Sequence, residues 1–228
     1  MSSNAKSADL RSIVLSRFWF KAFGTSAFTF VFFVAYLFLL QHPQSAVSTV
    51  PATWLDDAIG FQPAALPVYL SLWVYVSLPP LIMRTRSEIV DYGVRIGTLC
   101  ATGLAVFYFW PNAVPPAHID WAQYPGMAFL KKIDAAGNAC PSLHVATAVF
   151  SSLWLFWRLR HLGLGWMLQL LNIAWCVGIA YSTLATKQHV TLDVFAGTAL
   201  ALGLAQLTGI RDHACGRSQW LRLRAAPA

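Results

Sequence analysis

Two histidines and one aspartate stand out in this chain of 228 residues, because each lies at the start of a long apolar stretch. His144 begins one such stretch, and His189 and Asp193 begin a later one. Ionisable side chains inside apolar segments are costly, so they are candidates for functional groups. A carboxylate four residues after a histidine lies one helical turn away, where it can hold the proton of one imidazole nitrogen and leave the other as a nucleophile.

The surroundings of these residues favour a phosphate ligand. Two helix N-termini, one at Ser142 and His144 and one at His189, would open into the same pocket, and such ends bind phosphate through their unpaired N–H groups. The Ser142 hydroxyl can cap its helix or bind a phosphate oxygen. Two alternatives remain at this point: packed, hydrogen-bonded histidines without chemistry, and a zinc site made from the two histidines and Asp193.

The elements that must position these groups are membrane spans. Hydrophobic residues make up 57% of the chain and charged residues 11%, with a mean hydropathy of +0.55, so a water-facing surface cannot be built. A bilayer core of roughly 30 Å needs about 20 apolar residues per helix. Six stretches fit: Ala22–Leu40, Leu66–Met83, Tyr92–Trp110, Ala139–Trp157, Leu162–Leu184 and Val190–Ile210. We predict an all-α, polytopic membrane protein with about six transmembrane helices and a helix-bundle core.

The basic residues predict how these spans are oriented. All but three of the 16 Lys and Arg residues flank the stretches on one side, and the exceptions are Lys131, Lys132 and Lys187. The positive-inside rule makes the rich side cytoplasmic, places both termini inside and turns the histidines outward. The net charge of +7 then reflects topology and contact with anionic lipids, and we do not expect nucleic-acid binding. Short loops favour a bacterial inner membrane with the site facing the periplasm.

The remaining segments add boundaries but no further chemistry. We expect an interfacial N-terminal segment over residues 1–21, a membrane domain over 22–210 and a basic cytoplasmic tail over 211–228. The loop over residues 42–65 contains Asp56 and Asp57, and an ordinary interfacial segment is favoured there over a lid. The four cysteines are widely spaced, with no CxxC pair, so neither a disulfide nor a zinc site is predicted. They are Cys100, Cys140, Cys176 and Cys215.

Two stretches resemble motifs of a known family. Ala139–Ala146 (ACPSLHVA) resembles the Pro-Ser-x-His motif of the type 2 phosphatidic acid phosphatase superfamily, and Tyr181–Gly197 (YSTLATKQHVTLDVFAG) resembles its last motif, Ser-Arg-x5-His-x3-Asp. The resemblance implies that His189 attacks phosphorus and forms a phosphohistidine, while Asp193 orients it. It also implies that His144 protonates the leaving oxygen and then activates the acceptor, with no metal or other cofactor.

The resemblance further implies a set of residues that bind the substrate phosphate: Ser142, Ser182, Thr183 and Lys187. The sequence departs from the family pattern here. Thr183 stands where the last motif has Arg, and Phe107–Pro116 keeps prolines but lacks the cations of the first motif, Lys-x6-Arg-Pro. Lys187 is either a substitute cation or a lysine that reaches the interface, and Lys131 or Lys132 could also substitute.

The predicted substrate is a lipid phosphate or diphosphate, met in the membrane. The form Ser-Thr-Leu followed by Thr-Lys-Gln-His is similar to the branch that includes inositol phosphorylceramide synthases, which transfer a head group. A water acceptor would give a phosphatase and a hydroxyl acceptor a phosphotransferase, and both remain open. A lipid-phosphate binder or flippase without turnover is the alternative of a different class, motivated by the missing cations.

Overall fold

The computed structural model describes residues 11–133 and 137–214. Within these ranges the chain is mostly helical, as predicted. The expectations for Cys215, for residues 1–10 of the N-terminal segment and for residues 215–228 of the C-terminal tail lie outside the described residues.

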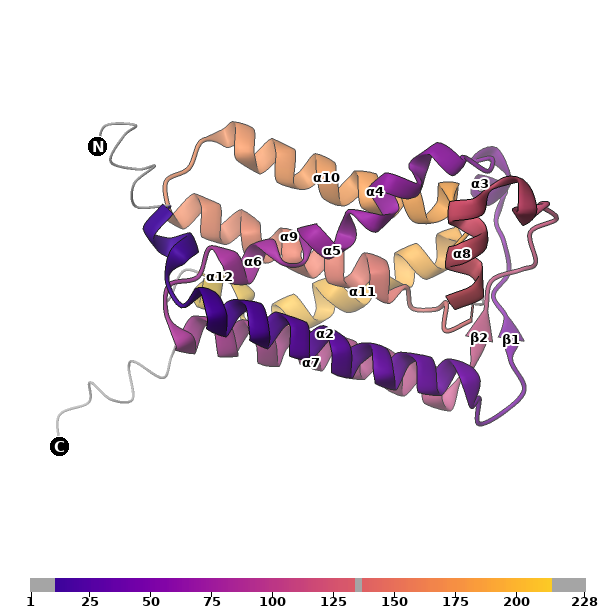
Figure 1. The fold of residues 1–228 in the computed structure, drawn as a ribbon, viewed down its shortest axis with the longest axis horizontal. Coiled ribbons are helices and arrows are strands. Elements are labelled where there is room, and N and C mark those ends of the chain that lie inside the picture. The colour runs from indigo at the N-terminus through magenta and orange to yellow at the C-terminus, as the bar shows by residue number, and fades with distance from the viewer. Residues whose placement is uncertain (1–10, 134–136, 215–228) are drawn as a thin grey trace.

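Long helices lie side by side along the length of the molecule (Figure 1). They are α2 (Phe18–Gln41), α7 (Arg86–Phe109), α9 (Leu143–His161), α10 (Trp166–Ala185) and α11 (Thr191–Leu207). By length and composition, α2, α7 and α10 are long and apolar enough to cross a membrane, whereas α11 is a shorter apolar helix. The described chain therefore contains three such helices, and the predicted number of six is not confirmed.

The second predicted span is not one continuous helix. It is built from α4 (Leu66–Leu70), α5 (Leu72–Tyr75) and α6 (Leu78–Leu81). Pro79 and Pro80, at the start of α6, lack the N–H donors with which a helix continuing from α5 would bond the carbonyls of Tyr75 and Val76. At the two breaks, Ser71 Oγ donates to Val68 O and Ser77 Oγ donates to Trp73 O, a type of bond that competes with the backbone pattern and bends helices.

Helix α9 is the central element, because it contacts α7, α10, α11 and α12 (Ile210–Ala214) as well as α5 and α6. Its buried face carries Phe150 and Trp154, which pack with Leu99 of α7 in the main hydrophobic cluster. Since His144 lies in the first turn of α9, this packing fixes where His144 lies relative to the rest of the bundle.

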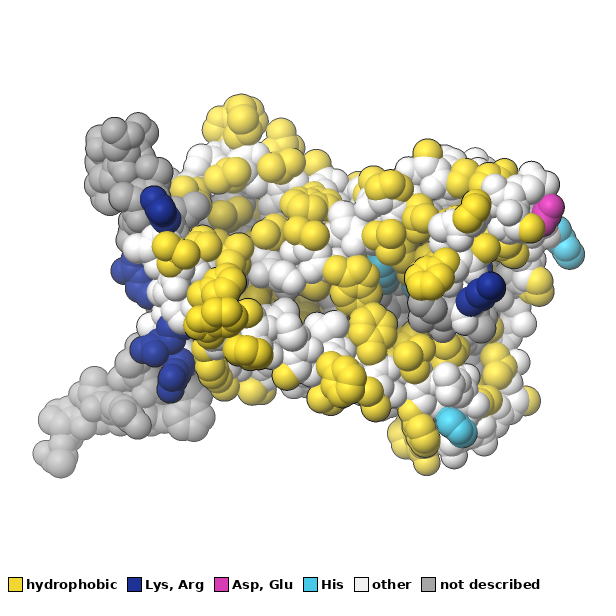
Figure 2. Space-filling model, viewed as in Figure 1, with side chains coloured by type: hydrophobic (Ala, Val, Ile, Leu, Met, Phe, Trp, Pro, Cys, Tyr) yellow, Lys and Arg dark blue, Asp and Glu magenta, His cyan; other side chains and the backbone are white. Residues whose placement is uncertain are grey.

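The two ends of the bundle differ in content. One end carries α3 (Trp54–Ala58), the 3-10 turns Pro63–Ala65 and Trp121–Gln123, α8 (Pro125–Ile133) and the parallel pair β1 (Ser48–Thr49) and β2 (Asn112–Ala113). Figure 2 shows hydrophobic side chains over the length of the bundle and most of the visible Lys and Arg side chains gathered at the opposite end. The predicted segregation of basic residues thus has a counterpart in the fold.

Candidate active site

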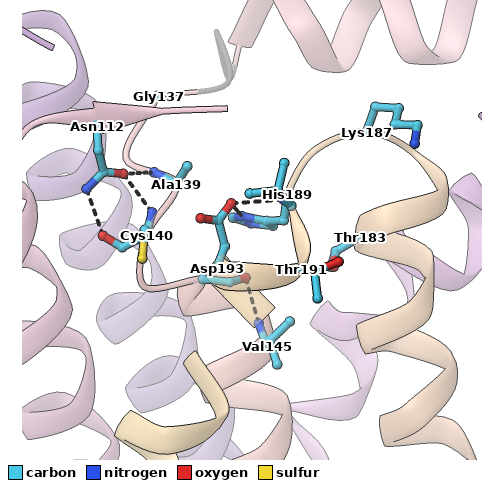
Figure 3. Close-up of polar contacts among 12 residues, drawn as sticks. Asn112, Gly137, Ala139, Cys140, Val145, Thr183, Lys187, His189, Thr191 and Asp193 are labelled. Atoms are coloured by element: carbon cyan, nitrogen blue, oxygen red, sulfur yellow. Dashed lines mark hydrogen bonds and ion pairs between the residues drawn. The ribbon is translucent and has the colours of Figure 1, made fainter. Parts of the chain in front are cut away.

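His189 and Asp193 make the contact predicted from their spacing. Asp193 Oδ2 lies 3.3 Å from His189 Nδ1, and Asp193 is fully buried (Figure 3). The expected arrangement on one helix face is wrong, however, because α11 begins at Thr191 and leaves His189 outside the helix. Asp193 Oδ2 also accepts a 3.0 Å hydrogen bond from Val190 N. The carboxylate therefore caps the helix and orients the imidazole with the same oxygen.

His144 lies in the first turn of α9, where Tyr69 holds its ring. His144 Nε2 lies 3.1 Å from Tyr69 O. Since a carbonyl only accepts, Nε2 carries the proton of this hydrogen bond, and Nδ1 is the nitrogen that can take up or release a proton. The imidazole stacks on the Tyr69 ring with centroids 4.1 Å apart. His144 and His189 line the same cavity and lie within electrostatic reach of each other. The structure thus brings together all three predicted catalytic residues.

The starts of α9 and α11 are joined directly. Ser142 N donates to Asp193 O at 3.0 Å, and Ser142 Oγ accepts from Val145 N at 3.2 Å. A Cβ placed on Gly197 would lie 2.4 Å from Ser142 O, so this close approach requires a glycine. Ser142 therefore caps α9, the first of the two roles considered for its hydroxyl.

Asn112 supports the segment that leads to His144, and sequence reasoning missed it. Its Oδ1 accepts from Ala139 N at 2.9 Å and from Cys140 N at 2.7 Å, while Nδ2 donates to Cys140 O at 2.8 Å (Figure 3). Asn112 is 1% exposed and lies in the stretch where the first family motif was sought. The sequence signal for Asn112 is a single amide side chain between an apolar run and two prolines.

Asp56, which the sequence analysis placed in an ordinary interfacial segment, contacts the start of α11. Its Oδ1 accepts from Thr191 N and Thr191 Oγ1, each at 2.8 Å, and its Oδ2 accepts from Thr53 N and Thr53 Oγ1. Burial acts to raise the pKa of this carboxyl, but the hydrogen bonds from Thr53 and Thr191 outweigh burial and hold the pKa below its ordinary value. The loop over residues 42–65 is therefore hydrogen-bonded to the start of α11, next to His189.

Lys187 also binds the segment that contains Asp56. Its Nζ donates to Asp56 O and to Ile59 O, each at 2.6 Å, and in Figure 3 its side chain points away from His189. Lys131 Nζ donates to Lys187 O at 3.1 Å, whereas Lys132 is exposed. Of the three lysines considered as substitute cations, Lys187 contacts the loop instead of facing the histidines, and Lys131 lies against the segment that carries His189.

Ser182 and Thr183 direct their hydroxyls into their own helix. Ser182 Oγ donates to Ile179 O and Thr183 Oγ1 donates to Ala180 O, each at 2.7 Å. Thr183 O accepts from His189 N at 3.2 Å. The residue that replaces the family's Arg thus supports the histidine through its backbone carbonyl.

In residues 11–133 and 137–214, no three His, Cys, Asp or Glu side chains gather in a way that could hold a metal ion. These ranges therefore show no donor set for the zinc alternative. The cysteines of these ranges, Cys100, Cys140 and Cys176, are buried and form no disulfide.

Comparison with known proteins agrees with the motifs. A model of the PAP2 superfamily matches residues 92–210, which include His144, His189 and Asp193. No curated protein and no solved structure matches the chain. The superfamily match covers more than half of the sequence and confirms the resemblance drawn from the two motifs. Members of this superfamily are phosphatases or phosphotransferases acting on phosphoesters, and the chain belongs to the PAP2 superfamily.

Proposed function

We propose that this protein is an integral-membrane enzyme that cleaves the phosphoester of a lipid phosphate or diphosphate through a phosphohistidine on His189, without a metal ion. The observation that carries the proposal is the His189–Asp193 pair at 3.3 Å, which shares one cavity with His144. That cavity is lined mostly by apolar side chains, which suits a substrate that is itself a lipid.

In the first step His189 Nε2 attacks phosphorus. Asp193 holds the proton on Nδ1, so Nε2 presents its lone pair, and the carboxylate stabilises the positive charge that develops on the ring. The N–P bond forms as the bond from phosphorus to the leaving oxygen breaks. His144, protonated at Nδ1, gives that proton to the leaving oxygen.

In the second step an acceptor hydroxyl or water loses its proton to His144 Nδ1 and attacks phosphorus, which breaks the N–P bond and regenerates both histidines. The N-terminal N–H groups of α9 and α11 would stabilise the phosphoryl oxygens. Lys131 is the cation best placed to assist, because it lies against the segment that precedes His189. We assign Ser142, Ser182, Thr183 and Lys187 to the scaffold of this phosphate site, since each uses its polar side chain on backbone groups.

We further propose that the chain crosses the membrane six times, with both termini in the cytoplasm and the site facing outward, toward the periplasm in a bacterium. The basic residues near Arg17, Arg84 and Arg160 support this orientation. The start of α11, just after His189, supports it too, because it is bound to α3 at the end of the bundle that carries α3 and α8.

A lipid-phosphate binder without turnover is the second candidate. The observation that favours it is the use of Lys187 Nζ on the carbonyls of Asp56 and Ile59, which leaves the phosphate site with fewer cations than the family motifs would supply.

The deciding experiment measures phosphate release from lipid phosphates and diphosphates in detergent with EDTA. We expect release by the wild type, its loss in His189→Ala, and its retention in His118→Ala, which removes an exposed histidine of an outer loop. Retained release by His189→Ala would contradict the histidine mechanism.

The same panel separates the remaining candidates. A second arm adds inositol or diacylglycerol as acceptor, and a phosphorylated product that forms only there assigns the transferase. Lipid-phosphate binding without turnover in either arm assigns the binder.

A further inference from the structure

The cavity that holds the two histidines extends far beyond them. It has a volume of about 450 Å³ and is lined by α2, by α4 to α6, by α7 and by the first turns of α9. Its lining reaches from Tyr36 to Phe20 along α2, which spans roughly 24 Å at 1.5 Å per residue. The bilayer core is about 30 Å thick, so the cavity follows most of the membrane depth.

The chemistry of the lining changes along this length. His144, His189 and Asn138 lie at one end, and Phe20, Pro80 and Ile89 lie at the other. No Asp, Glu, Lys or Arg is among the described residues that line it, and the polar Thr147 uses its hydroxyl on Leu143 O. A molecule that matches this lining has a phosphate at one end and an extended hydrocarbon chain behind it.

Helix α2 covers the cavity and is fastened at both of its ends. Near the cytoplasmic end, Lys21 Nζ donates to Leu81 O at 3.0 Å and to Ile13 O at 2.7 Å. Near the outer end, Tyr36 OH donates to Gly137 O and Asn138 Nδ2 donates to Tyr36 O. These contacts limit how far α2 can move away from α6 at one end and from the segment before α9 at the other, and so they limit the width available to a ligand.

We propose that this cavity binds a single extended hydrocarbon chain of the substrate, and that its inner half sets the preferred chain length. The inference rests on the proposed function, because it assigns a tail to the lipid phosphate that the histidines would cleave. The volume lies within the range of about 300–1,000 Å³ typical of small-ligand pockets. Since the cavity follows one helix over roughly 24 Å, it accommodates one extended chain, and a two-chain lipid would leave its second chain in the bilayer.

Two glycines of the lining offer a direct test. A Cβ added at Gly24 or at Gly93 meets no atom within 4 Å, and both residues line the inner half of the cavity. A leucine at either position can therefore be accommodated by the protein while it occupies space that a chain would use. Gly203 of α11 is the matched control, since a Cβ there also meets no atom and the residue does not line the cavity.

The experiment compares phosphate release from monoalkyl phosphates of about 6 and about 18 carbons, at one fixed lipid-to-detergent ratio. Each methylene that lies against the lining gains dispersion contacts with it, so the wild type and Gly203→Leu should prefer the long chain in kcat/KM. We expect Gly93→Leu and Gly24→Leu to lower the ratio of long-chain to short-chain kcat/KM by about tenfold or more. A ratio equal to that of Gly203→Leu in both variants would overturn the inference.

A binding measurement separates this inference from the proposed function. In a His189→Ala background, the rise in Tm caused by each alkyl phosphate is compared with and without Gly93→Leu. A chain-length dependence that Gly93→Leu removes supports the tail site even if the wild type releases no phosphate. Phosphate release that depends on His189, combined with no chain-length dependence of binding or rate, supports the enzyme and rejects the tail site.

Discussion

A single amide side chain organises the segment before His144. Asn112 binds three backbone groups of Ala139 and Cys140, and it is almost fully buried. Buried backbone N–H groups need an acceptor, and in this segment the acceptor comes from a residue 28 positions earlier. The position of His144 therefore depends on a residue that has no role in proton transfer.

We expect Asn112→Leu to lower both stability and activity. The variant has a similar volume but leaves two buried N–H groups without their acceptor, at a cost of about 2–4 kcal/mol. Because the segment leading to His144 loses its support, kcat should also fall, by about tenfold or more. The measurements are the Tm and the kcat for lipid-phosphate hydrolysis at a temperature where the variant is folded.

Asn172→Leu is the control for this prediction. Asn172 is also buried and hydrogen-bonded, to Tyr75 and Ser152, but it lies away from the histidines on α10. Its loss should lower the Tm and leave the kcat of the folded protein close to that of the wild type. Equal kcat values for the two variants would show that Asn112 has only a structural role.

At this scale the sequence predicted contacts between near neighbours and missed those between distant ones. His189 and Asp193 are four residues apart, so their spacing alone indicated the contact. Asp56 and Thr191 are 135 residues apart, and nothing in either segment indicates the other. Lys187 was considered as a phosphate ligand because it is a cation near His189, but its carbonyl partners are equally distant in sequence.

Among the elements, the short helix α3 has a larger role than its length indicates. Asp56 of α3 caps the start of α11 from a separate segment, at a position where Val190 offers no polar side chain. The first N–H groups of a helix have no partner within the helix, so a carboxylate from outside satisfies one of them and interacts favourably with the helix dipole. Helix α3 thereby fixes the point at which α11 begins, two residues after His189.

We expect Asp56→Asn to destabilise the protein by about 2–3 kcal/mol at neutral pH, since the amide places a donor against donors of Thr53 or Thr191. The folded protein lowers the pKa of this carboxyl below 3.8. Its stabilisation is therefore complete above that pH and is lost as the pH falls through the lower folded value. The Tm difference between wild type and variant should shrink below about pH 4.

Asp57→Asn is the control, because Asp57 is an exposed neighbour on the same helix. It should change the Tm little at any pH, as surface substitutions usually do. A Tm difference for Asp56→Asn that stays constant down to pH 3 would contradict the assignment of the effect to the carboxylate.

Capping residues mark element boundaries that an apolar count does not, since the count began the third span at Tyr92 whereas α7 begins at Arg86. Thr85 and Glu88 form a capping box at the start of α7, and Ser142 caps α9. The stretch Leu66–Met83 was expected to be one span because hydropathy counts apolar residues and ignores the donors that its prolines lack. The breaks at Ser71 and Ser77 follow from hydrogen bonding, which an average over the stretch does not register.

On the scale of the whole molecule, the charged residues separate the two ends of the bundle. Arg84 precedes α7 and Arg160 is near the end of α9, and both of these points lie at one end of the bundle. His189 precedes α11, whose start is bound to α3 at the other end. Composition and loop charge predicted this separation because both are properties of the chain as a whole. The detailed packing of α9 against α7, α10 and α11 depends on pairs of faces, which composition does not determine.

The proposed orientation predicts which surface positions meet an impermeant thiol reagent on intact cells. His118→Cys should be labelled from outside, and Arg160→Cys only after the membrane is opened. Both residues are exposed, and they lie between β2 and α8 and near the end of α9, which are at opposite ends of the bundle. Labelling is measured by the mass shift of the purified protein, with the unchanged protein as background. The reverse pattern would place the histidines in the cytoplasm.

The cavity beneath α2 also determines how a substrate concentration should be expressed. A lipid whose chain enters from the bilayer reaches His189 as a two-dimensional solute, without first dissolving in water. The rate at which enzyme and substrate meet then depends on the mole fraction of that lipid in the bilayer or micelle. The bulk molar concentration of the lipid has little effect on this rate. Adding inert amphiphile at constant substrate therefore slows turnover by dilution within the surface, as an inhibitor would, although nothing binds to the protein.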